Sequence, residues 1–135
     1  MKKYPLLTFI GDVYRPSDDS WLILSLLDKT SPKGDLCLDL GAGSGILGLY
    51  ALLNGNCKRI VFVDVHEDAV ETIVANIRLN GVVHAITILS DDITLRESSV
   101  EIVLANPPYL PIQRTNHVDI ATEGGVNGYE TTLYF

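Results

Sequence analysis

The chain has 135 residues, 47% of them hydrophobic and 20% charged, which is the composition of an ordinary globular domain. This length fits one compact domain and excludes a two-domain enzyme. Ten Lys and Arg residues stand against 17 Asp and Glu, giving a formal net charge of −7. That balance disfavours nucleic acid as a stand-alone ligand, because binding to phosphates usually requires a basic face.

The cysteines and the N-terminus favour a cytoplasmic protein. Cys37 and Cys57 lie apart without a CxxC motif, and the three histidines are dispersed, so we expect reduced thiols and no metal site. The apolar run near the N-terminus ends at Gly11, too early for a signal peptide. No stretch approaches the roughly 20 apolar residues that a membrane span requires.

The first half of the chain predicts two helices and a strand. Residues 16–29 open with Pro16 and a run of acids and cap formers, which predicts a helix N-terminus. After a turn at 31–34, the short apolar run 36–40 predicts a buried strand that ends in glycines. Residues 46–54 then favour a second helix, which stops at Gly55.

The second half repeats this rhythm. The β-branched run 59–64 predicts a strand, and a third helix follows with Val70, Ile73, Val74 and Ile77 on one stripe. Residues 85–89 and 100–105 predict two more strands. Alternating strands and helices indicate an α/β fold with a mostly parallel sheet and helices on both faces. Ligands of such sheets bind beyond the carboxyl ends of the strands, where the polar clusters of this chain fall.

The first strand end carries a glycine loop, residues 39–45, with the sequence DLGAGSG. Glycines at alternate positions allow a sharp turn and leave room for a ligand. A plain strand–helix turn would also use them, and Gly43, Gly45 and Gly48 fit the dinucleotide fingerprint. That fingerprint leaves Asp39 and Gly41 without a role, whereas an acid before the loop suits a cationic ligand such as a sulfonium amino acid.

The next two strand ends are acidic. Asp64 closes the second predicted strand, where a carboxylate can accept both ribose hydroxyls of a nucleoside. Ser90-Asp91-Asp92 follow the third strand, and a side-chain oxygen there could accept a hydrogen bond from an adenine amino group. A solvated turn is the alternative interpretation of Asp92.

The fourth strand end, Asn106-Pro107-Pro108-Tyr109, decides the interpretation. A planar amino nitrogen is a poor nucleophile because its lone pair is delocalised. The Asn106 side-chain oxygen and the Pro107 carbonyl can each accept one of its N–H hydrogens, which orients the nitrogen and stabilises developing charge. The Tyr109 ring can lie against the flat group, and the two prolines hold the turn rigid.

These motifs resemble the class I S-adenosylmethionine-dependent methyltransferases with an NPPY motif. The match is best to the HemK/PrmC-like protein-glutamine methyltransferases, which modify the GGQ glutamine of translation release factors. Residues 13–21 look like the VYxPxEDTF segment of the archaeal and eukaryotic branch, with Asp18 in place of Glu and Ser20 in place of Thr. Residues 121–128 resemble the GGxDG segment of the family, with Asn127 in place of Asp.

The resemblance implies a Rossmann-like fold, S-adenosylmethionine as cofactor and S-adenosylhomocysteine as product. It assigns cofactor contacts to Ser20, Asp39, Gly41, Gly43, Asp64, Asp91, Asp92 and Asn106. It assigns the substrate amide to Asn106, Pro107 and Tyr109, which are the expected catalytic residues.

We expect one domain, with an N-terminal strand and helix in residues 1–30 and the cofactor-binding and NPPY core in residues 36–135. The resembled fold continues beyond four strands, so the core is expected to lack its C-terminal strands. The archaeal and eukaryotic branch also works with a small zinc-binding activator subunit, which the resemblance implies as a partner beside the release factor. Nucleic acid is expected only as an indirect partner, and no membrane.

Two alternatives remain open at this point. An adenine-N6 methyltransferase acting on RNA or DNA would present the same planar nitrogen to the NPPY site. A non-catalytic cofactor-binding chain or fragment would keep the glycine loop and lack turnover.

Overall fold

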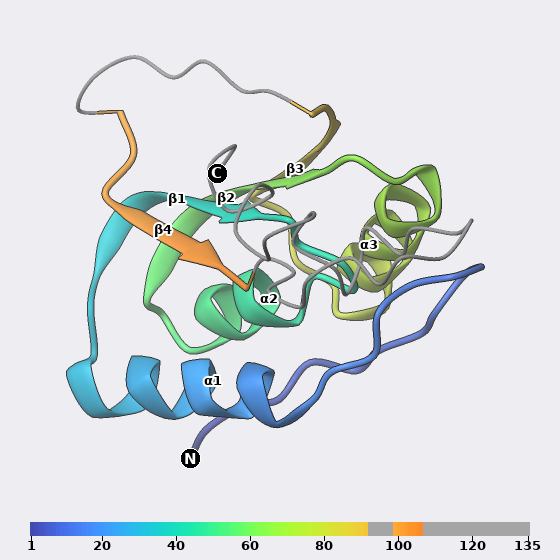
Figure 1. The fold of residues 1–135 in the computed structure, drawn as a ribbon. Helices are drawn as coiled ribbons and strands as arrows, with labels where there is room; N and C mark the ends of the chain where they lie inside the picture. Colours follow the sequence, from blue (N-terminus) through green and yellow to red (C-terminus); the bar gives the residue numbers. More distant parts are fainter. Residues whose placement is uncertain (92–98, 107–135) are drawn as a thin grey trace, which may run out of the picture.

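The computed structural model describes residues 1–91 and 99–106, which form a layered α/β fold (Figure 1). The helices and strands predicted between residues 16 and 105 are confirmed, with small differences at the ends. The elements are α1 (Asp18–Thr30), β1 (Gly34–Leu40), α2 (Ile46–Leu53), β2 (Cys57–Asp64), α3 (Glu67–Leu79), β3 (Ala85–Leu89) and β4 (Ile102–Ala105).

The four strands form one parallel sheet in the order β3-β2-β1-β4. The chain starts at β1 in the middle, moves outward through β2 to β3, and then returns to the other side of β1 as β4. This change of direction creates a topological switch point between β1 and β4, the place where ligands bind in open parallel sheets.

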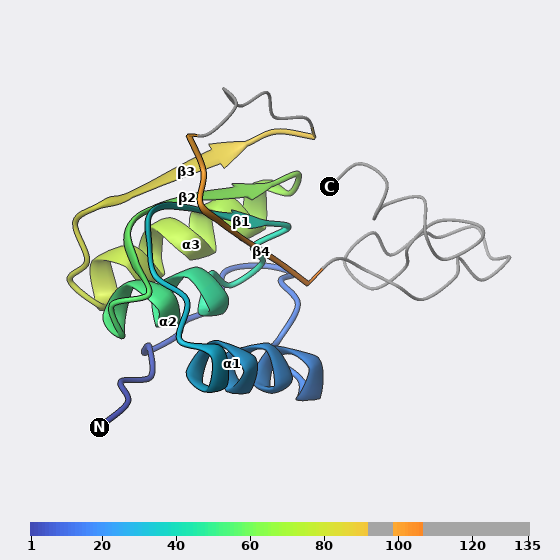
Figure 2. The same ribbon diagram turned by 90° about the vertical axis from the view of Figure 1, so that its left-hand side faces the viewer.

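The three described helices lie on one side of the sheet (Figures 1 and 2). The helices α2 and α3 pack on the strands, and α1 packs against α2. A core of buried apolar side chains fills the space between them, including Phe62 of β2 and Tyr50 of α2. Among the described residues, no helix lies on the opposite face, where helices are also expected.

Close approach of α2 to the sheet depends on Gly48. A Cβ atom at this position would meet the side chains of Ile60 and Phe62, with Phe62 Cζ only 2.9 Å away. A larger residue would therefore force the helix away from β2. This is a packing role for the third glycine of the dinucleotide fingerprint, and it involves no ligand.

The N-terminal segment differs from the prediction, because no residue before Asp18 belongs to a strand. Residues 3–12, here called the strap, instead run along α3 and end near its first turn. Figure 1 shows this segment passing behind α1, turning, and returning to the start of α1. Gly11 lies in this turn with a left-handed backbone, φ 68°. The N-terminal residues thus form an extended segment that lies on α3, and not the expected strand of the sheet.

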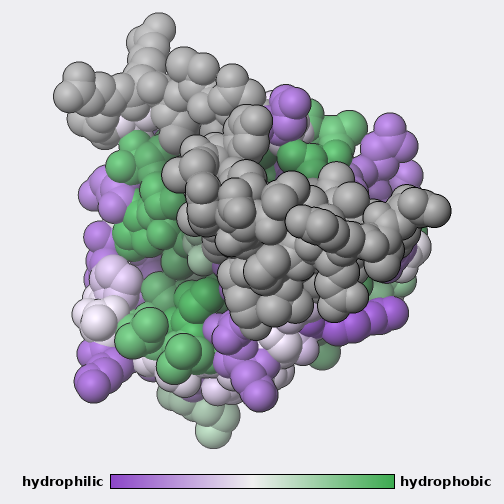
Figure 3. Space-filling model, viewed as in Figure 1, coloured by the Kyte–Doolittle hydropathy of each residue, from purple (hydrophilic) through white to green (hydrophobic). Residues whose placement is uncertain are grey.

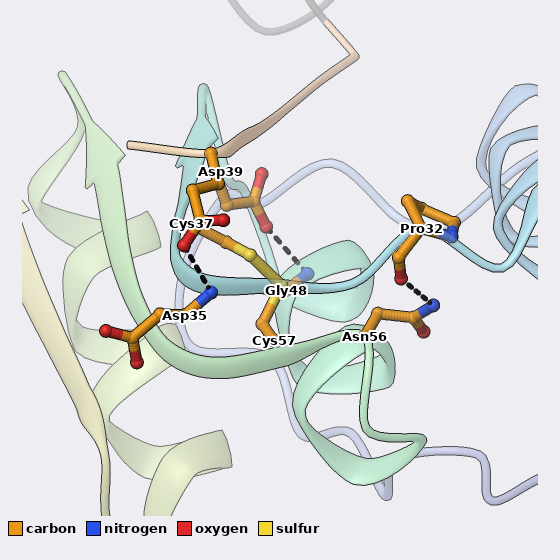
Figure 4. Close-up of a disulfide and its surroundings, with 8 residues drawn as sticks. Pro32, Asp35, Cys37, Asp39, Gly48, Asn56 and Cys57 are labelled. Carbon is orange, nitrogen blue, oxygen red and sulfur yellow. Dashed lines mark hydrogen bonds between the residues drawn. A yellow bond between two sulfur atoms is a disulfide. The ribbon is translucent and has the colours of Figure 1, made fainter. Parts of the chain in front are cut away.

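The expectation of reduced thiols is wrong in the structure, because Cys37 and Cys57 form a disulfide (Figure 4). The two residues belong to neighbouring strands, β1 and β2, and their Cα atoms are 6.0 Å apart, within the span of a disulfide. Spacing along the sequence carried no information on this distance across the sheet. Disulfides are rare in cytosolic proteins, so the pairing weighs against the predicted cytoplasmic location.

The surface is mixed in polarity. Figure 3 shows apolar patches over α1 and the edge strand β4, where Trp21, Leu22, Leu26 and Val103 are exposed. In the part of the chain that the structure describes, no helix is long and apolar enough to cross a membrane.

Candidate cofactor and acceptor site

Strand register brings the predicted site residues to one edge of the sheet. A row of paired residues, Ala105, Leu40, Val63 and Ile88, crosses all four strands. The next residue along β4 is Asn106, the next along β1 is Gly41, and the next along β2 is Asp64. The structure therefore confirms that these three residues, far apart in the sequence, share one end of the sheet.

The loop after β1 has the backbone shape that its glycines predict. Gly41, Gly43 and Gly45 have φ values of 60°, 58° and 84°, which are in the left-handed region that favours glycine. Gly45 also forms the N-cap of α2. A Cβ atom built on Gly43 would meet no described atom within 4 Å, so the backbone there faces open space. A ligand can approach this part of the loop closely.

Asp39 lies beneath the loop and is only 1% exposed. Its Oδ2 atom accepts a hydrogen bond from the backbone N–H of Gly48, 2.9 Å away, in the first turn of α2 (Figure 4). The carboxylate thus caps a helix whose own N-cap, Gly45, has no side chain to do so. Burial raises the pKa of the Asp39 carboxyl well above its usual range; the Gly48 bond opposes this, and the charge of Asp64 adds to it.

Asp64 joins the two loops that follow β1 and β2. Its Oδ2 atom accepts from the Gly43 N–H at 2.9 Å, and its Oδ1 atom accepts from the His66 N–H at 3.0 Å. Each carboxylate oxygen has two lone pairs, so both can still accept a further hydrogen bond. The residue is 7% exposed. Asp64 is thereby fixed in orientation while it retains acceptor capacity for a ligand.

The remaining predicted residues differ in what the structure says of them. Ser20 is buried in the first turn of α1, where its hydroxyl accepts from the Ser17 N–H at 3.3 Å. Asp91 is exposed just beyond the end of β3. Asn106 is half-buried after β4. Asp92, Pro107, Tyr109 and the segment 121–128 lie outside the described residues.

Sequence reasoning missed one residue that contacts the glycine loop. Asn76 of α3 is fully buried, and its Nδ2 atom donates to the Ser44 carbonyl at 2.9 Å. A signal was present in the sequence, since polar or acidic residues recur every fourth position at Asp68, Thr72, Asn76 and Asn80. The apolar stripe of this helix predicts its packing in the core and not this contact.

The sheet order, the glycine loop after β1 and the acid ending β2 define a Rossmann-like nucleotide-binding fold, and the similarity to known proteins makes it the class I methyltransferase fold. The chain belongs to the family described as ribosomal protein L11 methyltransferase (PrmA), whose model matches residues 20–113. Its relatives also include HemK-like methyltransferases. A protein of Methanocaldococcus jannaschii, provisionally named as an N5-glutamine methyltransferase, is 32% identical over 124 residues, 88% of this chain and 60% of that protein.

Two further comparisons agree with this class. Human methyltransferase HEMK2 is 29% identical over 133 residues, which cover 89% of this chain and 61% of HEMK2. The Mtq2 and Trm112 complex of E. cuniculi, described as responsible for methylation of the eRF1 termination factor, has the same fold. Its TM-score is 0.69 at 24% identity, over 90% of this chain and 65% of that one. The chain thus spans about three-fifths of the length of the two curated relatives.

Methyltransferases of this class use S-adenosylmethionine, and the described residues fit it. The open backbone at Gly43 leaves room for a ligand beside the loop. Asp64 is fixed by two backbone N–H groups and keeps a lone pair on each carboxylate oxygen, which suits the two ribose hydroxyls of a nucleoside. S-adenosylmethionine carries such a ribose.

Proposed function

We propose that the chain is the cofactor-binding and acceptor-positioning part of an S-adenosylmethionine-dependent N-methyltransferase. The acceptor that we propose is the side-chain amide of glutamine in a protein, specifically the GGQ motif of a translation release factor. One observation carries the proposal: the register that sets Asn106 beside the glycine loop and Asp64. The names of the M. jannaschii and human relatives support glutamine and a HemK-like enzyme.

For the cofactor, we propose that Asp64 accepts the ribose hydroxyls with its two remaining lone pairs. Gly41 and Gly43 would line the loop against the amino acid portion, with Asp39 offering a carboxyl oxygen from beneath the loop. Asp91 and Asp92 would receive the adenine amino group. Ser20 would reach the cofactor from the start of α1, in addition to its bond with Ser17.

For the acceptor, we propose that Asn106 accepts one N–H of the planar nitrogen through its side-chain oxygen. The Pro107 carbonyl would accept the other N–H, and the Tyr109 ring would lie on the amide plane. The bound cofactor supplies an electrophilic methyl group on a sulfonium. Asn106 and Pro107 would hold the nitrogen for direct transfer of that methyl group and would stabilise the positive charge developing on the nitrogen, until its N–H proton passes to solvent. No covalent link to the protein is required.

The partners follow from the same proposal. The release factor is the substrate, and a small zinc-binding activator is the proposed second subunit. With 17 acidic and ten basic residues, the chain itself favours a protein acceptor over nucleic acid. We keep the cytoplasm as the proposed location, against which the Cys37–Cys57 disulfide is the opposing observation.

The direct test is methyl transfer from labelled S-adenosylmethionine, with and without the candidate activator. The acceptors are a GGQ-bearing release factor, the same factor with its GGQ glutamine replaced by alanine, ribosomal protein L11, rRNA and DNA. We expect label only in the intact release factor. Label confined to nucleic acid would establish the adenine alternative, and label in L11 would follow the family description. Cofactor binding by calorimetry without any transfer would indicate the non-catalytic alternative.

Asn106→Ala tests the acceptor role separately. We expect cofactor affinity within about twofold of the unchanged chain, while turnover falls about 100-fold or more, because a donor or acceptor aimed at developing charge contributes that much. Calorimetry and single-turnover transfer measure the two effects. Turnover equal to that of the unchanged chain would remove Asn106 from this role.

A further inference from the structure

The strap is held on α3 by a ladder of polar side chains. Asn80, Asn76, Thr72 and Asp68 bind, in this order, Leu6, Thr8, Ile10 and Asp12 of the strap. Three of these side chains, those of Asn80, Asn76 and Thr72, both accept from the backbone N–H and donate to the C=O of one strap residue. The strap is therefore paired as in a β-sheet, with side chains in place of the second strand.

The geometry of the two segments explains this ladder. Four residues of an α-helix rise about 6.0 Å. Two residues of an extended chain span about 6.6 Å, and alternate residues direct their N–H and C=O to the same side. Side chains at every fourth position of α3 can thus meet every second residue of the strap over four rungs. The strap runs antiparallel to α3, so its C-terminal end reaches the edge of the sheet where α3 begins.

Asn76 differs from the other rungs of the ladder. Its Oδ1 atom accepts from the Thr8 N–H at 2.7 Å, and its Nδ2 atom donates to the Thr8 carbonyl at 3.1 Å. The same Nδ2 also donates to the carbonyl of Ser44 at 2.9 Å. Asn80 makes the equivalent pair of bonds to Leu6, but its additional bond goes to the Asn76 carbonyl within α3.

Ser44 lies between two glycines of the cofactor loop, and it is 3% exposed. The preceding residue, Gly43, is bound through its N–H by Asp64. Two peptide groups of the loop, Ala42–Gly43 and Ser44–Gly45, are thus held by two different elements, the end of β2 and the middle of α3. Because glycines cost more conformational entropy to order than other residues, such bonds matter more here than in a stiffer loop.

We propose that Asn76 is a positioning residue of the cofactor site, and that the strap keeps its amide turned toward Ser44. Thr8 fixes both ends of the Asn76 amide, so the Nδ2 hydrogens have a set direction. The cofactor loop then has its bound shape before the ligand arrives. This inference rests on the proposed binding of S-adenosylmethionine at the glycine loop.

The first test compares Asn76→Asp with Asn80→Asp. Each change keeps the acceptor oxygen for the strap N–H and removes both Nδ2 hydrogen bonds of that side chain, but only Asn76→Asp loses the bond to Ser44. We expect the Kd for S-adenosylhomocysteine, measured by calorimetry on folded protein, to rise about tenfold in Asn76→Asp, since one hydrogen bond contributes about that factor. For Asn80→Asp we expect a change below about twofold.

A buried carboxylate at position 76 can prevent folding, so a second pair of variants lies in the strap. Thr8→Pro removes the N–H that Asn76 accepts, and Leu6→Pro removes the N–H that Asn80 accepts. Both positions are exposed, and an extended backbone tolerates proline. We expect weaker cofactor binding in Thr8→Pro than in Leu6→Pro, with similar losses of Tm.

The outcomes separate this inference from the proposed function. If the unchanged chain binds S-adenosylhomocysteine and both members of each pair bind it equally, Asn76 has only a structural role and the inference is overturned, while the proposed function stands. If the unchanged chain binds neither S-adenosylhomocysteine nor S-adenosylmethionine, the proposed function fails and the inference with it. A lower Tm shared by both members of a pair, with different Kd values, supports positioning.

Discussion

Asp39 and Asp64 show how one residue type serves two tasks at one end of a sheet. Asp64 is held by two backbone N–H groups, from Gly43 and His66, which fix its carboxylate without using all its lone pairs. Asp39 is buried and accepts a hydrogen bond from the Gly48 N–H, and the negative charge of Asp64 raises its pKa further. Burial dominates and raises the pKa of Asp39. The charged form of Asp39 is therefore costly in the folded chain.

This cost makes a prediction for Asp39→Asn. The folded pKa lies above the usual value of 3.8, so the stability that this group contributes is complete below that pH and is lost as pH rises toward the folded pKa. The variant has no carboxyl at position 39 and escapes this loss. We expect its free energy of unfolding, relative to the unchanged chain, to increase as the pH rises above about 4.

Urea unfolding of both proteins across this range measures the difference, and all other titrating groups are common to the two. A difference that stays constant with pH would contradict a raised pKa at Asp39.

The residue types of the site were predictable from the sequence, because an apolar run followed by glycines or by an acid can be recognised there as a buried strand and its end. The partners were not, since the Gly48 contact depends on how α2 folds back onto β1.

At the scale of elements, periodicity predicted all seven helices and strands of the described residues. Apolar stripes and β-branched runs depend on local sequence, and burial on one side of the sheet reinforces them. The disulfide between β1 and β2 was predicted wrongly for the opposite reason. Whether two cysteines meet is decided by strand pairing, to which their spacing along the chain is no guide. The strap was missed likewise, because its partners are side chains 56 to 74 residues away.

The disulfide gives a prediction at this scale. It closes a loop with a sequence separation of 20 residues, and constraining such a loop in the unfolded state contributes about 3 kcal/mol. We expect a reductant to lower the free energy of unfolding by about this amount. The double variant Cys37→Ala with Cys57→Ala serves as control and should not respond to reductant. An unchanged curve for the natural chain, with both thiols free in a thiol titration, would show that the bond does not form.

For the whole molecule, the strap joins the N-terminus to two helices. Lys3 pairs with Asn54 at the end of α2, and the following rungs pair with α3. The partly buried side chains of Leu7 and Phe9 face away from the exposed row of alternate residues, and Leu7 packs against the main core. The strap thus lies over the helices, and every second residue of the strap is bonded to every fourth residue of α3.

Hydrogen exchange can test this pattern at single amides. The N–H groups of Leu6, Thr8 and Ile10 are bound to side chains, whereas the described residues offer no bonded partner to those of Leu7 and Phe9. We expect alternating protection, slow at the even positions and fast at the odd ones, with the even positions exchanging together when the strap opens. Uniformly fast exchange over residues 6–10 would mean that the ladder does not persist in solution.

The ladder also sets an order of events during synthesis. Residues 3–12 leave the ribosome before their partners in α3, which lie between Asp68 and Asn80, so most of the strap has nothing to bind until β1, α2 and β2 have been made. Its contacts are among the most distant in sequence, and closing such long loops comes late in folding. Ser44 gains its hydrogen bond from Asn76 only after α3 has formed. A segment made early is therefore bound late, and until α3 forms the Ser44 carbonyl of the glycine loop lacks its hydrogen bond from Asn76.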